Sequence, residues 1–133
     1  MVTITFPEHE TNDKGLNVKI KCHLLEDDAM RDAGFTMTDA VGHWYYIKMI
    51  VPGDHYDLGI SFNVYINMED EEDFGIDVLD ENFLQPYDYQ RMINGKPVNE
   101  SSIPYTVYKK VEEEMERLTE LGIISGHVKG EYI

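Results

Sequence analysis

Positive charge is missing from the middle of this 133-residue chain. No lysine or arginine occurs between Lys48 and Arg91, and the same stretch contains eleven carboxylates. The whole chain carries a formal net charge of −15. Nucleic acid phosphates and anionic membrane surfaces repel such a protein. The composition therefore predicts no direct nucleic acid binding and no membrane binding, and it favours a basic surface on another protein as the partner.

Cysteine and long apolar runs are also scarce. Cys22 stands alone, which excludes an intrachain disulfide and a multi-cysteine zinc site. Its apolar position in an alternating segment predicts a buried, inert thiol. No stretch approaches the roughly 20 apolar residues of a membrane helix, and the N-terminal residues lack the pattern of a secretion signal. We expect a cytoplasmic protein.

Catalytic and nucleotide-binding motifs are absent from the sequence, including GxSxG, P-loop and GxGxxG patterns. On the predicted loop between the two clearest strands, histidine and carboxylates crowd together at Asp54-His55-Tyr56-Asp57. The segment Asp70–Glu81 fits a calcium loop superficially, but Phe74 occupies a position that requires an oxygen ligand. We therefore predict no catalytic residue, no metal site and no cofactor.

What the sequence does contain is a strong alternation of apolar and polar residues in its first two-thirds, which is typical of strands. The clearest case is 60–68, where one face is apolar throughout. Residues 43–51 are apolar on both faces, as in a central strand. Shorter strands are predicted at 2–6, 18–24 and 74–79. Short links with turn residues join the middle strands, which favours an antiparallel meander.

The last third predicts a long helix over 103–121. Ser101 or Ser102 is placed to cap it, Pro104 lies in its first turn, and Gly122 follows its end. An apolar stripe recurs at helical spacing through Ile103, Val107, Val111, Met115 and Leu118.

The predicted fold is a single α+β domain over residues 1–133. It contains an antiparallel sheet of four or five strands, with the long C-terminal helix packed on one face. Residues 26–33 fit either a helical turn or a loop. Residues 83–93 predict a short helix that begins at Pro86 and ends at Asn94.

Two sets of residues are candidates for partner binding. The first is an aromatic face of Trp44, Tyr46 and Tyr65, which we place on the side of the sheet away from the long helix. The N-terminal segment or residues 83–93 are the alternative cover for this face. The second set is an acidic turn with no lysine or arginine nearby in the sequence; its members are Glu69, Asp70, Glu71, Glu72 and Asp73.

Three functions compete at this stage. The first is a non-catalytic acidic interaction protein that binds a basic surface, including an inhibitor of a nucleic acid enzyme that imitates DNA. In a meander, however, the Asp54–Asp57 loop and the 69–73 turn lie at opposite ends of the sheet, which argues against one continuous acidic stripe. The second is a homo-oligomeric accessory or structural subunit. The third is a small enzyme that uses carboxylates and His55.

Overall fold

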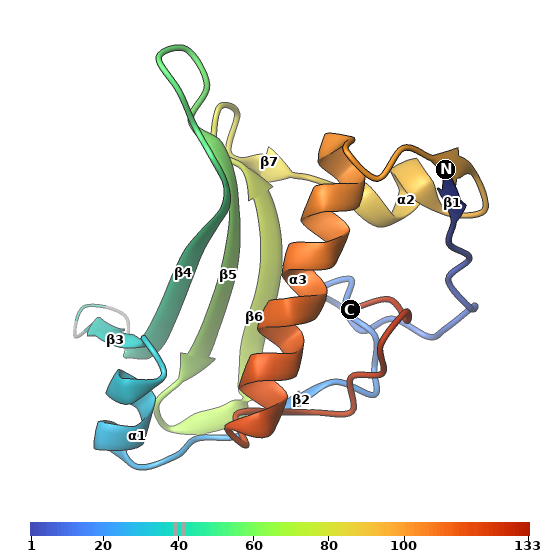
Figure 1. Ribbon diagram of the computed structural model, residues 1–133. Coiled ribbons are helices and arrows are strands. Elements are labelled where there is room, and N and C mark those ends of the chain that lie inside the picture. The colour runs from blue at the N-terminus through green and yellow to red at the C-terminus, as the bar shows by residue number, and fades with distance from the viewer. Residues whose placement is uncertain (39, 41) are drawn as a thin grey trace.

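Five strands form an antiparallel sheet in the order β3-β4-β5-β6-β7 (Figure 1). The computed structural model describes residues 1–38, 40 and 42–133. The strands are β3 (Thr36–Thr38), β4 (His43–Pro52), β5 (Gly59–Asn67), β6 (Asp70–Asp80) and β7 (Gln85–Pro86). Each strand pairs with the next one in the sequence, so the sheet is a meander. The predicted fold class is confirmed.

The two predicted N-terminal strands lie outside this sheet. β1 (Val2–Thr3) pairs with β8 (Pro97–Val98), and β2 (Lys21–Cys22) pairs with β9 (Ile124–Ser125). The strands predicted over 2–6 and 18–24 are therefore too long. Turns use backbone groups that a longer ladder would need: the Val18 N–H, for example, bonds to the Glu10 carbonyl at 3.0 Å.

Two short helices connect these strands. Residues 26–33 form a helix, α1 (Asp27–Asp32). The predicted helix at 83–93 is shorter than expected, because α2 (Tyr89–Ile93) begins after Asp88, whose carboxylate accepts the Arg91 N–H at 3.2 Å. Pro86 instead belongs to β7.

The long helix α3 (Ile103–Glu120) crosses one face of the sheet (Figure 1). Its stripe residues after Ile103 are fully buried, as predicted: Val107, Val111, Met115 and Leu118. Ile103 itself is exposed at the start of the helix. Gly122 has a φ of 82°, and the Ile123 N–H reaches back to the Leu118 carbonyl at 3.0 Å, which completes the predicted C-terminal cap. None of the described helices is long and apolar enough to cross a membrane.

The helix covers the face of β4 that carries Trp44 and Tyr46. The register pairs Tyr46 with Val64, whose side chain is fully buried, and Trp44 and Tyr46 are only 3% and 8% exposed. Tyr65 pairs with Tyr45 on the opposite face of the sheet. The predicted aromatic surface of Trp44, Tyr46 and Tyr65 is therefore wrong. Both faces of β4 are apolar, so the sequence did not show which one α3 covers.

The other face of the sheet is left open by the helices (Figure 1). The rings of Tyr45 and Tyr65 lie 6.0 Å apart on it, and the Tyr65 ring packs over Gly75, where a Cβ atom would collide with it. Lys14, from the N-terminal segment, places its ammonium group 5.1 Å from the centre of the Tyr65 ring. Ile47 is 61% exposed on this face.

Candidate interaction surfaces

The meander divides the acidic block between the two ends of the sheet, as predicted. The β4–β5 and β6–β7 loops meet at one end, which we call the hairpin end (residues 53–58 and 81–84). The β5–β6 connection and the first residues of β6 lie at the other end, which we call the turn end (residues 68–73) (Figure 1). β5 has nine residues, so the two ends are about 30 Å apart. Apart from Asp77 in the middle of β6 and Asp88 before α2, the carboxylates of this block form two separate clusters.

Asn82 fastens the two loops of the hairpin end together. Its side-chain amide donates to the carboxylates of Asp57 at 2.7 Å and Asp80 at 3.0 Å. Its side-chain carbonyl accepts the Leu58 N–H at 2.9 Å. A backbone bond from the Glu81 N–H to the Gly59 carbonyl, at 3.0 Å, adds to this contact. The two loops therefore present one joint surface.

The sequence cluster Asp54-His55-Tyr56-Asp57 forms the tip of this surface. Asp57 accepts bonds from the Asn82 side chain and the Gly59 N–H, and these bonds hold the pKa of its carboxyl below the usual range. Asp54 accepts the Tyr56 N–H at 3.1 Å, so it shapes the loop. Among the described residues, no group of three or more histidine, cysteine or carboxylate side chains is arranged to hold a metal ion.

Large apolar side chains project from both loops of the hairpin end. Tyr56 is 98% exposed, and Leu58, Phe83 and Leu84 are also mostly exposed. Leu84 adopts a positive φ of 52°, which is a strained conformation for a residue with a branched side chain. Exposed apolar side chains gathered in one place mark interaction sites in soluble proteins.

The sequence analysis missed this apolar cluster. Phe83 and Leu84 fall just before the short helix that the sequence predicts from Pro86, and Tyr56 and Leu58 are isolated apolar residues in a polar loop. The available signal was the position of Phe83-Leu84 directly after Asp80-Glu81-Asn82, which is a turn sequence. The position of their loop beside the β4–β5 loop follows only from the pairing of the strands.

Some carboxylates of the turn end have partners in the folded chain, so they repel one another less than the sequence indicated. β6 begins at Asp70, so most of the predicted acidic turn belongs to the strand. Lys14 forms a 2.9 Å ion pair with Asp73, and this bond lowers the pKa of the Asp73 carboxyl. Glu71 accepts the Leu24 N–H at 2.8 Å. Glu69 and Glu72 remain exposed.

Cys22 lies beside this segment and is buried, as predicted. Burial raises the pKa of its thiol to about 12, with a smaller contribution from the charge of Glu71. The thiol therefore stays protonated at neutral pH, which makes it a poor nucleophile.

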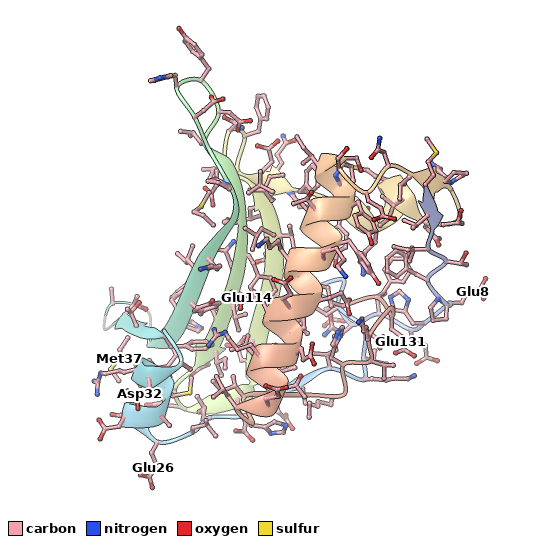
Figure 2. The ribbon with its side chains drawn as sticks, in the orientation of Figure 1. Glu8, Glu26, Asp32, Met37, Glu114 and Glu131 are labelled. Carbon is pink, nitrogen blue, oxygen red and sulfur yellow. The ribbon has the colours of Figure 1, made fainter. Side chains whose placement is uncertain are left out.

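A groove of about 600 Å³ separates β4 from α3. At its base the Tyr46 hydroxyl donates to one oxygen of Glu114 at 2.5 Å, and the Arg117 Nε donates to the other at 3.0 Å. Glu114 reaches from α3 toward the sheet in Figure 2, which also labels Asp32 at the α1 wall of the groove. The Arg117 Nη1 donates to the Ala33 carbonyl at 3.0 Å. This network joins the helix to the sheet and to α1.

Ionisation of Tyr46 should lower the stability of the fold at alkaline pH. Burial, and then the hydrogen bond and charge of Glu114, raise the pKa of Tyr46 to about 12 from an ordinary value near 10. Because the folded-state pKa is the higher one, this contribution to stability is fully present below about pH 10 and is lost as the pH rises through about 12. We expect the Tyr46→Phe variant to lose less stability than the wild type between these pH values in urea unfolding. Equal losses in both proteins would contradict the prediction.

The structure defines an α+β protein built on one antiparallel meander with a helix-covered face and an open face. It is similar to the 1.20 Å crystal structure of a DUF1831 family protein (lp2179) from Lactobacillus plantarum. The TM-score is 0.60, and the similarity covers 94% of this chain and 97% of that chain at 14% sequence identity. At this identity the similarity establishes the fold alone. No protein-family model and no curated protein matches the sequence.

Proposed function

We propose that this chain is a non-catalytic interaction protein that uses its hairpin end to bind an apolar site, rimmed by basic residues, on another protein. We also propose that the protein binds this partner in the cytoplasm. The partner supplies apolar contacts for Tyr56 and Phe83 and positive charge for the surrounding carboxylates. The single observation that carries the proposal is the exposure of four large apolar side chains on two loops that Asn82 holds together.

The physical chemistry of the surface supports this assignment. Aromatic side chains are the common anchors of protein interfaces, and charges around an apolar centre steer the encounter between partners. The carboxylates beside the anchors are Asp54 and Asp57, which are exposed on one loop, and Asp80 and Glu81, which precede Asn82 and are half-buried. The division of the acidic block into two clusters favours such local docking over imitation of a DNA duplex, in which phosphates follow one another continuously along the helix.

The test is quantitative capture from the native host's lysate with three variants of the full chain. Tyr56→Ser/Phe83→Ser should remove the partner that the wild type captures, because both side chains are exposed and their loss leaves the core intact. Asp54→Asn/Glu81→Gln should keep the partner but flatten the dependence of association on salt. Both substitutions retain the hydrogen-bond acceptors that shape the loops.

The turn end provides the charge control. Glu69→Gln/Glu71→Gln/Glu72→Gln removes three charges from the other cluster, one more than the hairpin-end variant, and we still expect it to leave capture and its salt dependence unchanged. Loss of capture in this variant, with capture retained by Tyr56→Ser/Phe83→Ser, would contradict the proposal and assign docking to the acidic segment 69–73.

A further inference from the structure

The outer edge of β4 is paired over only part of its length. β3 pairs with residues 43–45, and the part of the chain that the structure describes provides no other partner on that side. β5 occupies the opposite edge along the strand. Above β3, the outer edge of β4 is therefore open from Tyr46 onward (Figure 1).

The backbone groups of Ile47 and Met49 point to this open edge. The Gly42 carbonyl accepts a hydrogen bond from the residue that follows β5, whereas the His43 carbonyl accepts the Thr38 hydroxyl on the β3 side. Backbone direction alternates from residue to residue in an antiparallel ladder. The backbone groups of Ile47 and Met49 therefore point in the same direction as those of His43. Because both residues lie beyond the end of β3, their N–H and C=O groups are free.

The chain itself explains why β3 does not continue along this edge. The register places Gly34 opposite Ile47, but Gly34 has a φ of 101° and donates its N–H to the Arg31 carbonyl at 2.9 Å. The backbone therefore turns into α1. At the other end, the pairing of β4 shifts between Met49 and Val51, and Pro52 follows. The open segment has room for about four residues of an added strand.

The groove between β4 and α3 runs beside this edge, and Lys48 and Lys110 line it from opposite sides. Lys48 forms no ion pair with any described residue. The Arg117 Nη2 is buried without a hydrogen-bond partner. The carboxylates of the groove belong to its α1 and α3 walls: Asp32, Glu113 and Glu114. Lys48 is the charged side chain on the strand itself.

We propose that the open edge of β4 accepts an extended segment of a partner protein as an added antiparallel strand, with an acidic side chain opposite Lys48. Ile47 and Met49 would exchange backbone hydrogen bonds with the segment. Residues opposite Lys48 would occupy a non-hydrogen-bonded position, where cross-strand side chains approach most closely, so an opposite charge is favoured there. This surface is separate from the hairpin end and does not rest on the function proposed for it.

Charge favours a partner segment over a second copy of this chain. In a symmetric antiparallel pair of β4 edges centred on residue 48, the two Lys48 side chains would lie directly opposite each other, which is unfavourable. The bulge after Met49 and the proline at 52 further limit pairing between copies. The features that restrict self-association leave the positions beside Ile47 and Met49 available to a short segment.

The experiment is a selection of displayed random nonapeptides on the immobilised full chain, followed by binding measurements with the selected peptides. We expect enrichment of an acidic residue at one central position within an alternating sequence. Met49→Pro, which lacks the edge N–H, should bind these peptides about tenfold more weakly, whereas Met49→Thr, which retains it, should bind within about twofold of the wild type. Amide exchange at Ile47 and Met49 should slow when a selected peptide is bound.

A second variant, Lys48→Glu, tests the proposal independently if Met49→Pro does not fold. This variant should prefer peptides in which the central acid is replaced by lysine, which reverses the wild-type preference. Three results would overturn the proposal: no binder emerges from the library, the selected peptides bind Met49→Pro or Lys48→Glu as they bind the wild type, or the slowed amides lie elsewhere. A dimer with protected Ile47 and Met49 amides in the free protein would instead assign the edge to a second copy.

Discussion

The Met115→Asp variant should be strongly destabilised. Met115 lies in the buried stripe of α3 and has no exposed surface. Truncating such a side chain costs about 2–5 kcal/mol, and an unpaired buried carboxylate adds several more. We expect the free energy of unfolding to fall by at least ~4 kcal/mol, which is a large part of the stability of a domain of this size. Urea unfolding followed by far-ultraviolet circular dichroism measures this change.

Met92 supplies a matched control for this substitution. It is the same residue type on the neighbouring helix α2, but it is 44% exposed. Met92→Asp should change the free energy of unfolding by less than about 1 kcal/mol, because its carboxylate can remain hydrated. A Met115→Asp protein as stable as Met92→Asp would show that α3 does not pack against the sheet through this stripe.

Breaking the link between Tyr46 and Glu114 should give the second large effect. Tyr46→Phe leaves one oxygen of a buried carboxylate without its donor, and Glu114→Gln removes the charge that Arg117 pairs with. Each change should cost about 1–3 kcal/mol. The double variant should lose less than the sum of the two, with a coupling of about 0.5–3 kcal/mol, because Tyr46→Phe removes the hydrogen bond to the carboxylate and Glu114→Gln removes the charge that strengthens the same bond.

The adjacent residue on α3 provides the control. Glu113 is exposed and lies 4.0 Å from Lys110, an arrangement that contributes little to stability. Glu113→Gln should therefore change the free energy of unfolding by less than about 0.5 kcal/mol and should be additive with Tyr46→Phe. Additive effects of Tyr46→Phe and Glu114→Gln in urea unfolding would mean that the hydroxyl and the carboxylate do not act as one unit.

Local patterns in the sequence determined the elements whose periodicity is clear. The stripe of α3 has the 3.6-residue repeat, and residues 60–68 have a strict two-residue repeat, so each has one possible buried face. The glycine at 122 likewise marked the end of the helix, because the left-handed conformation required there favours glycine. The meander also followed from the short links, and with it the separation of the acidic block into two clusters.

Tertiary structure decided which face of an ambiguous strand is buried. β4 is apolar on both sides, so its own sequence permits either orientation. Pairing with β5 removes the choice, because Tyr46 must share the face of Val64, and Val64 belongs to the apolar face of β5. A shift of one residue in this register would have exposed Trp44 and Tyr46 and buried Tyr45.

Contacts between segments that are distant in the sequence could not be predicted from it either. Lys14 meets Asp73 across 59 positions, and Asn82 meets Asp57 across 25. Neither contact leaves a periodic signal in the sequence, because each depends on which strands and loops become neighbours. The sequence by itself determined the layers of the fold and the location of the negative charge. Only the folded chain decided which charges are paired, which apolar side chains are left exposed together, and where the edge of β4 is left open.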